Sequence, residues 1–449
     1  MLYLSAAMAI NSNSISVKHN SIVMYVDMNS YFASCEQQRH PHLRNKPIGV
    51  LTYDSPNASV IAASIEAKRM GVKTGMRLYD CKLLCPEIIP VTTHPAWYRQ
   101  IHVEIMAILR TYCDDVIAKS IDEALMNFTS YRLVYKDFTE IARKIKSDIV
   151  AKYDYLKCSI GIAPNAFLAK LGTELQKPDG LIEITPDNID SYLARLKLTD
   201  LPGIASANER RLQMIGIRSP LEMRHSSEAL LRKAFGGIVG NYWYKRLHFM
   251  EVDIYSNPFR SMSAARTLSR QIRENRQAMD SMLIALCMRL EQRMVKNKVF
   301  CKEILFTIRY FDGNRWETKI KLADPVQDGM YMRRYILDKM AEHERAYNIS
   351  SLLTDKVQNM GVTVMGFVDE KLLQYGLFDN QMKQDIVRKV MYEMKDKYRK
   401  NIVRKGSEIL VPGVLKDAIG FGSVKDMSPD SNGEVVNKFM LEEDVDDEL

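Results

Sequence analysis

Short apolar runs that end in acidic residues mark the first third of the chain. Residues 22–26 (Ile-Val-Met-Tyr-Val) form an apolar run too short for a confident helix, and the run ends on Asp27. In residues 116–128, two apolar runs lie on either side of Asp122 and Glu123. These patterns predict a buried strand ending on a carboxylate and a hairpin with adjacent carboxylates at its tip. Taken singly, each also fits an ordinary acidic residue at a strand end.

Helical and extended patterns alternate after these two segments. We expect helices at about 64–70, 97–114, 138–153 and 165–176, and strands at 47–52, 59–63 and 158–162. This order predicts an α+β domain with helices on one face of an antiparallel sheet. Lys170 and Lys177, seven residues apart, would share a helix face and point at the carboxylate edge, although most such lysines are simply solvated.

Residues 201–209 (Leu-Pro-Gly-Ile-Ala-Ser-Ala-Asn-Glu) form a sharper local pattern. The Pro-Gly pair predicts a turn, and Ser206 with Glu209 predicts a capping box that opens a helix ending at Gly216. A helix–hairpin–helix of this kind exposes backbone N–H groups that bind DNA phosphates without reading sequence. An ordinary helix pair is the alternative.

The C-terminal half begins with a basic segment after a linker at Pro258. Arginines stand at 260, 266, 270, 273 and 276, and only Glu274 opposes them. Nucleic-acid contact explains this one-sided charge better than surface solubility does. A second α+β unit follows, with helices at 278–296 and 328–347 and strands near 301–310, 316–322 and 360–368. A charged helix is expected from about 381 to 400.

Composition narrows the class of protein. The 449 residues carry a formal net charge of +8, but the last twenty hold eight acidic residues and one lysine, so the rest carries +15. A body this basic usually meets a polyanion, and the acidic end is typical of a disordered tail. No apolar run has the length of a membrane span, and residues 1–20, which lack a basic start, read as a loosely ordered extension without a secretory signal. Seven scattered cysteines indicate reduced thiols rather than disulfides or zinc ligands.

Carboxylates gathered at one sheet edge favour a hard divalent cation. Mg²⁺ commonly takes one or two carboxylates together with substrate phosphates. Two such ions can stabilise the attacking and leaving oxygens of a phosphoryl displacement.

Five motifs in this order and spacing resemble the Y-family translesion DNA polymerases. They are residues 26–36, 66–72, 120–124, 177–180 and 201–204. The likeness extends from about Ser21 to Asp369, and the first two motifs look more like the UmuC-like bacterial branch than the polymerase IV branch. It implies an α+β right-hand polymerase with a ferredoxin-like palm, small fingers, a helix–hairpin–helix thumb and a little-finger domain.

The implied domain bounds follow from the motif positions. After an extension at 1–20, they are 21–30 and 95–184 for the palm, 31–94 for the fingers, 185–257 for the thumb, 258–370 for the little finger and 371–449 for a C-terminal tail.

The resemblance also implies the catalytic residues. Asp27 and Asp122 would hold two Mg²⁺ ions, assisted by the Met28 carbonyl, and Glu123 would complete the site. The incoming nucleotide would lie against Tyr31 and against a steric gate, Phe32, which blocks a ribose 2′-OH. Lys68 and Lys177 would hold its triphosphate.

DNA and clamp contacts are implied elsewhere in the chain. DNA would contact Gly203 and Ala205 in the thumb, and Arg266, Arg270 and Arg273 in the little finger. Gln374, Leu377 and Phe378 resemble the short peptide with which bacterial polymerases bind the sliding clamp, where two apolar anchors fill a pocket.

Three positions depart from the family pattern. Ile65 and Lys68 stand where Tyr and Arg are common, so a bidentate guanidinium becomes a point charge. Ala205 stands where a second hairpin glycine is common.

The implied function is template-directed, low-fidelity synthesis past damaged bases, with primer–template DNA and dNTP as substrates. The resemblance further implies a cytoplasmic, SOS-regulated mutator protein with accessory mutagenesis subunits as partners. A catalytically silent accessory subunit and a palm-fold nucleotide cyclase are the alternatives. The three carboxylates argue against the first, and the thumb and basic segment argue against the second.

Overall fold

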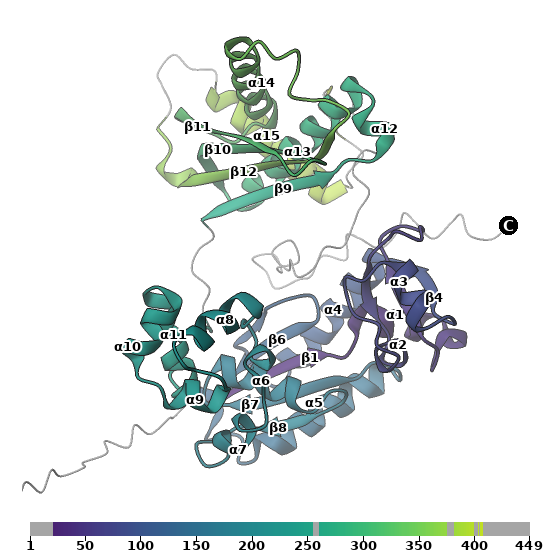
Figure 1. The fold of residues 1–449 in the computed structure, drawn as a ribbon, viewed down its shortest axis with the longest axis vertical. Coiled ribbons are helices and arrows are strands. Elements are labelled where there is room, and N and C mark those ends of the chain that lie inside the picture. The colour runs from purple at the N-terminus through teal and green to yellow at the C-terminus, as the bar shows by residue number, and fades with distance from the viewer. Residues whose placement is uncertain (1–20, 255–259, 375–380, 399–402, 404, 407–449) are drawn as a thin grey trace, which may run out of the picture. The chain divides into compact units, whose positions relative to one another are not determined.

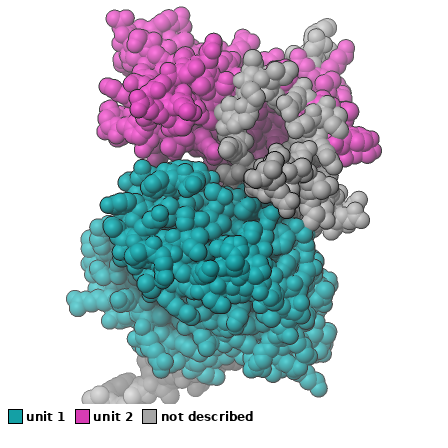
Figure 2. Space-filling model, turned by 90° about the vertical axis from the view of Figure 1, so that its right-hand side faces the viewer, with its two compact units in different colours: residues 1–256, 418–435 teal, residues 257–417, 436–449 magenta. Residues whose placement is uncertain are grey.

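The computed structural model describes residues 21–254, 260–374, 381–398, 403 and 405–406 (Figure 1). They form two compact units, divided between Ser256 and Asn257 and coloured separately in Figure 2. Each unit is described by itself. Within the described residues, no helix is both long and apolar enough to cross a membrane. All seven cysteines are buried and free.

A five-stranded sheet is the centre of the first unit. Its strands, in spatial order, are β5 (Val116–Ala118), β6 (Glu123–Asn127), β1 (Val23–Met28), β7 (Cys158–Ala163) and β8 (Leu181–Glu183). All neighbours are antiparallel except β7 and β8. The predicted hairpin and both predicted strands are therefore confirmed.

Helices cover both faces of this sheet, so the expectation of helices on one face was wrong. Met24, Val26 and Met28 of β1 pack in a core with α4 (Pro95–Arg110) and α5 (Phe138–Lys152). Val23 and Tyr25 point the other way, into a core with α6 (Ala166–Leu175). All six residues of β1 are buried, which is why its apolar run does not alternate with polar residues.

Helix α6 approaches the sheet unusually closely because two glycines face each other. A Cβ on Gly161 of β7 would lie 1.9 Å from the carbonyl oxygen of Ala169, and one on Gly172 would lie 3.0 Å from the Gly161 Cα. The backbones of helix and strand are thus in direct contact.

A smaller three-stranded sheet forms the fingers. Its order is β3 (Val60–Ala63), β2 (Ile48–Leu51) and β4 (Ile89–Thr92). The helices of this region are α1 (Tyr31–Arg39), η1 (Pro41–Leu43), α2 (Ile65–Arg69) and α3 (Leu78–Leu84). The antiparallel β2–β3 pair confirms the prediction, whereas the parallel strand β4 was missed.

Short helices and turns complete the first unit. They are η2 (Thr129–Tyr131), α7 (Ile189–Leu193), η3 (Leu198–Asp200), α8 (Ser206–Met214), α9 (Pro220–His225), α10 (Glu228–Phe235) and α11 (Ile238–Leu247). The predicted capping box before α8 is wrong. Ala205 occupies the N-cap position, and Ser206 is already the first helical residue.

The second unit is a four-stranded antiparallel sheet with helices on one face. Its order is β11 (Arg315–Val326), β10 (Val299–Tyr310), β12 (Val357–Asp369) and β9 (Ser261–Thr267). Helices α13 (Arg276–Lys296) and α14 (Gly329–Ala346) share its core. The remaining elements are α12 (Arg270–Arg273), η4 (Glu370–Leu372) and α15 (Gln381–Tyr398). Strand β9 lies where the sequence indicated only a basic segment.

Helix α15 packs on this unit through a buried arginine. The Arg388 guanidinium lies 2.9 Å from Asp328 and 2.5 Å from Asp385, and 3.8 Å from the fully buried Glu291. Lys405 lies 2.5 Å from Glu291. Each of these charges has a partner of opposite sign, which limits the cost of burying it, although the three carboxylates outnumber the two cations.

Candidate active site

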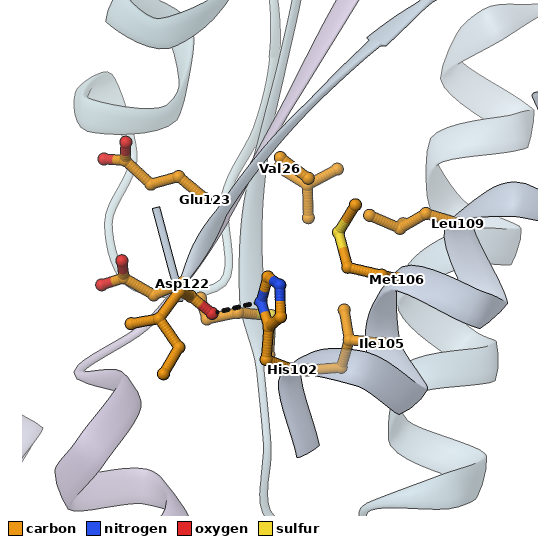
Figure 3. Close-up of a pocket in the computed structure, with 10 residues that line it drawn as sticks. Val26, His102, Ile105, Met106, Leu109, Asp122 and Glu123 are labelled. Atoms are coloured by element: carbon orange, nitrogen blue, oxygen red, sulfur yellow. Dashed lines mark hydrogen bonds between the residues drawn. The ribbon is translucent and has the colours of Figure 1, made fainter. Parts of the chain in front are cut away.

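Three carboxylates meet at one end of strands β1 and β6. Asp27 lies directly opposite Glu123 in the antiparallel register. The N–H of Met28 donates a hydrogen bond of 2.9 Å to the carbonyl oxygen of Asp122. Figure 3 shows the side chains of Asp122 and Glu123 pointing to the same side of the hairpin. The structure thus brings together the acidic residues that the sequence singled out.

Two lysines contact this cluster. Lys177 Nζ lies 2.9 Å from Asp27, and Lys170 Nζ lies 2.8 Å from Glu123. The hydroxyl of Tyr25 donates a second hydrogen bond to Glu123, at 2.8 Å. Lys177 follows the end of α6, so the expected shared helix face was wrong, although both ammonium groups reach the carboxylates. Tyr25 was missed, and its position two residues before Asp27 on a strand was the available signal.

Burial changes the protonation of the three carboxyl groups. It raises the pKa of Asp27 to about 7, an effect that the charge of Lys177 only partly offsets. Burial also raises the pKa of Asp122, against the hydrogen bond that the Ser120 hydroxyl donates. Burial would likewise raise the pKa of Glu123, but Lys170 and the Tyr25 hydroxyl outweigh it and the pKa is lowered. Positive charge brought near Asp27 and Asp122 would therefore stabilise their ionised forms.

The donor set fits a magnesium site that shares its ligands with a substrate. Among the described residues, no group of three or more His, Cys, Asp or Glu side chains is arranged to hold a metal ion by itself. Glu123 and Asp27 each pair with a lysine, and Asp122 has no ion pair among the described residues, so a cation would take Asp122 directly and Asp27 in exchange for Lys177. One or two carboxylates together with phosphate oxygens are what Mg²⁺ usually takes.

Lys68 of α2 stands near Lys177. Burial lowers the pKa of Lys68, and the charge of Lys177 lowers it further, while Asp27 raises it. A polyphosphate is a chemically suitable partner for these two ammonium groups.

Phe32 is held at the start of α1 by an aromatic neighbour. Its ring stacks on Tyr98 of α4 with centroids 4.8 Å apart, and 7% of the residue is exposed. Tyr31 points into the core, where its hydroxyl donates to the carbonyl oxygen of Tyr98 at 2.6 Å. Only the backbone N–H of Tyr31 remains for a nucleotide, since the first N–H groups of a helix lack intrahelical partners.

A buried carboxylate, which the sequence did not suggest, fixes Tyr98. Glu36 is fully buried and accepts a short hydrogen bond from the Tyr98 hydroxyl. Its carboxylate also lies 2.9 Å from Nδ1 of His94. The aromatic support beneath Phe32 is thereby held in one orientation.

The turn before α8 carries the two thumb residues. Gly203 has a φ of 93°, a conformation that favours glycine. Ala205, at the N-cap, is exposed. A groove of about 620 Å³ lies between α6 and this turn, lined by Lys170, Glu174 and Gly203 among others.

The three little-finger arginines differ in orientation. Arg266 lies opposite the fully buried Met360, so it points toward the helix-covered face of the sheet. Arg270 and Arg273 lie on α12. Arg270 pairs with Glu274 at 2.7 Å, and the Arg273 guanidinium stands 4.7 Å from the ring centre of Phe311. Of the clamp-like peptide, Gln374 is exposed, and Leu377 and Phe378 lie outside the described residues.

Comparison with known proteins decides the family. The impB/mucB/samB family matches residues 26–174, and the C-terminal domain of that family matches residues 259–377. The chain belongs to the Y family of DNA polymerases. It is a DNA-directed DNA polymerase of the translesion type, and the silent-subunit alternative is not favoured.

Two relatives illustrate the similarity of this Y-family chain to named proteins. DNA polymerase IV of Bacillus velezensis is 28% identical over 403 residues, which cover 86% of this chain and 93% of that protein. DNA polymerase IV of Neisseria meningitidis serogroup B is 31% identical over 214 residues, covering 48% and 67%. Both relatives are named DNA polymerase IV. The assignment of this chain to the UmuC-like branch, which the motifs suggested, stays a prediction.

Solved structures agree on the Y-family fold. A Y-family chimera, Dbh-Dpo4(243-245)-Dbh, has a TM-score of 0.65 at 24% identity, covering 78% of this chain and 99% of that one. An insertion ternary complex of Dbh DNA polymerase has a TM-score of 0.53 at 25% identity, with the same coverage.

Proposed function

We propose that this polymerase joins dNTPs to a primer 3′-OH at the carboxylate cluster, with Asp27, Asp122 and the Met28 carbonyl holding two Mg²⁺ ions. The register that sets Asp27 opposite Glu123, with Asp122 bound to the next backbone N–H, carries this proposal. When bound, the ions supply charge neutralisation and lower the pKa of the attacking hydroxyl. Glu123, kept ionised by Lys170, adds negative charge that favours cation binding.

Lys177 and Lys68 are proposed to bind the triphosphate of the incoming nucleotide. Lys177 and Lys68 would turn from protein carboxylates to the triphosphate oxygens as the nucleotide enters, and so orient it. The N–H groups at the start of α1 would bind further phosphate oxygens, because a helix N-terminus favours anions. Phe32, braced by Tyr98, would then lie beneath the sugar and exclude a 2′-OH by steric clash.

DNA binding involves both units. In the thumb, the N–H groups around Gly203 and Ala205 are suited to a phosphate contact. In the little finger, the helix-free face of the sheet, the exposed Arg270 and the half-buried Arg273 are suited to the duplex. Arg266 contributes less, because its strand position faces the helices.

We propose that residues 374–378 bind the sliding clamp and that accessory mutagenesis subunits bind α15. The outer face of α15 exposes Met382, Ile386, Val390 and Tyr398, each 46–52% exposed. An apolar stripe of this kind usually marks an interaction site. A cytoplasmic, damage-induced mutator role is part of the same proposal.

The catalytic proposal is tested by Asp122→Ala. We expect primer extension to fall at least about 1,000-fold, since loss of a metal ligand removes several kcal/mol of transition-state stabilisation. DNA affinity should be unchanged in the same preparation. Glu140→Gln, an exposed acid on α5, is the matched control. Extension by Asp122→Ala at the control's rate would refute the assignment.

The clamp proposal is tested by Leu377→Ala combined with Phe378→Ala. Distributive synthesis should persist and stimulation by the clamp should vanish, since tethering acts through effective concentration. Leu372→Ala is the control, because this residue is 75% exposed in η4 but outside the peptide. Full clamp stimulation in the double variant would reject the motif.

A further inference from the structure

The two peptide groups on either side of the Asp122 Cα are each held by a hydrogen bond. Nδ1 of His102, on α4, lies 2.7 Å from the carbonyl oxygen of Ile121 (Figure 3). On the other side, the carbonyl oxygen of Asp122 accepts the Met28 N–H of β1. The backbone that carries Asp122 is therefore tied to both a helix and a strand.

Asp122 depends on this backbone more than its neighbours do. Asp27 and Glu123 are each oriented by a lysine. No ion pair to Asp122 is found in the part of the chain that the structure describes, and its side chain accepts a 2.5 Å hydrogen bond from Ser120 and a bond from its own backbone N–H, both within the same turn. The position of this carboxylate is thus set mainly by the turn on which it stands.

The chemistry of the His102 contact is unambiguous. A carbonyl oxygen can only accept, so Nδ1 must carry the hydrogen and donate it. The residue is 5% exposed, and burial lowers the pKa of its imidazole, which keeps the ring neutral. Beside the ring, Ile105, Met106 and Leu109 line a cavity of about 10 Å³. This space is at the lower limit for one water, so water is a poor substitute for the ring.

We propose that His102 is a positioning residue for catalysis, which fixes the Asp122 carboxylate by holding the Ile121 carbonyl. The inference rests on the proposed metal-binding role of Asp122. Loss of the donor leaves a buried carbonyl oxygen without a partner, and the turn would rotate to reach water. A displacement of about 1 Å at a reacting group can lower a rate by about 100-fold.

Three variants isolate the hydrogen bond. His102→Leu keeps an apolar side chain and removes the donor. His102→Asn keeps a donor at the same place, because the Asn amide nitrogen and His Nδ1 are both bonded to Cγ. Met106→Leu alters the same cavity wall one turn along α4, without touching the Ile121 carbonyl.

We expect His102→Leu to lower kcat by about 10- to 100-fold, with the KM for dNTP and the affinity for DNA nearly unchanged. His102→Asn should restore most of kcat, and Met106→Leu should leave it unaltered. A structural role alone would lower the melting temperature of His102→Leu without this kcat-selective loss or its rescue by Asn.

A second readout needs no catalysis. Mn²⁺ binding to the full chain without nucleotide or DNA, followed by electron paramagnetic resonance, should weaken in His102→Leu and recover in His102→Asn. Imidazole ¹⁵N resonances of the wild type should show the neutral Nδ1–H tautomer.

The outcomes separate this inference from the catalytic proposal. An inactive Asp122→Ala together with a fully active His102→Leu would overturn the role of His102 and leave the proposed function standing. Extension by Asp122→Ala at the wild-type rate would remove the basis of both. Equal losses in His102→Leu, His102→Asn and Met106→Leu would show a packing effect and reject the positioning role.

Discussion

The palm sheet and the little-finger sheet are both built largely from antiparallel strands, but only the palm sheet has helices on both faces. Every residue of β1 is buried, whereas buried and partly exposed residues alternate along β10 from Glu303 to Ile308. The reactive groups of the palm therefore stand at the end of a fully enclosed sheet, where burial moves their pKa values. The little finger keeps one face open, which suits contact with a large, regular and polar partner such as DNA.

The charges follow the same division. In the palm, Lys170 and Lys177 each lie within 3 Å of a specific carboxylate. On the open face of the little finger, Arg309 and Lys321 are exposed along β10 and β11. A buried charge needs a specific partner of opposite sign. Exposed charges act through their total number, and salt screens them.

The largest expected effect comes from adding a side chain where α6 contacts the palm sheet. Gly161→Ala would place a Cβ 1.9 Å from a backbone oxygen, so we expect a loss of about 3 kcal/mol or more in stability. Gly361→Ala is the counterpart on the open face, where the nearest atom to the new Cβ is the Ala265 Cβ at 3.3 Å and backbone atoms lie at 3.9 Å or more. It should change stability by less than about 1 kcal/mol. Chemical denaturation of the full chain compares the two, and similar losses would contradict the distinction.

Discrimination between dNTP and rNTP should depend on the buried ring of Phe32. Phe32→Ala removes the ring that Tyr98 supports, so the rNTP/dNTP ratio of kcat/KM should rise at least about 10-fold with little loss of dNTP use. Single-nucleotide incorporation measures it. An unchanged ratio would mean that Phe32 is only a core residue.

The salt dependence of DNA affinity should show which arginines of the little finger contact phosphates. Each phosphate contact contributes about one unit of log–log slope of DNA affinity against salt. Arg270→Gln with Arg273→Gln should lower the slope by about two. Arg266→Gln, facing the helices, should lower it less. If Arg266→Gln alone accounts for the change, our orientation of the DNA-binding surface is wrong.

The smallest effect concerns acid stability of the little finger. Burial would raise the pKa of Asp328, but Lys405 and Arg388 outweigh it and the pKa is lowered. The ionised group then stabilises the fold above the unfolded pKa of about 3.9, and this contribution is lost as pH falls through the lower folded value. Asp328→Asn keeps the N-cap of α14 but not the charge. Its stability deficit should therefore shrink below about pH 4. A deficit that grows on acidification would reverse our assignment.

Much of the site was predictable because its signals are local. An apolar run ending on Asp27 and a hairpin tip at Asp122 and Glu123 are patterns within a dozen residues. The cross-strand register then follows from sheet geometry. Strand β4 and strand β9 were missed because their pairing depends on distant partners, and β9 is rich in small residues.

Contacts across layers left no sequence signal. Nothing around His102 indicates that its ring meets the Ile121 carbonyl, since the contact depends on how α4 packs on the hairpin. The same holds for Glu36, whose burial follows from Tyr98 and His94 on another helix. The helices on the second face of the palm sheet were not predicted either. The unbroken apolar run of β1 was the available signal, because it is typical of a strand buried on both faces.

The glycine contact between β7 and α6 has a consequence for how this chain can vary. Lys170 lies on α6 between Ala169 and Gly172, so its reach to Glu123 is set by how near the helix axis comes to the sheet. A side chain at either glycine would lift the whole helix and withdraw the ammonium group, whatever residue stood at position 170. The lysine and the two glycines therefore have to be retained together. The lysine reaches Glu123 only if both glycine positions stay without a side chain.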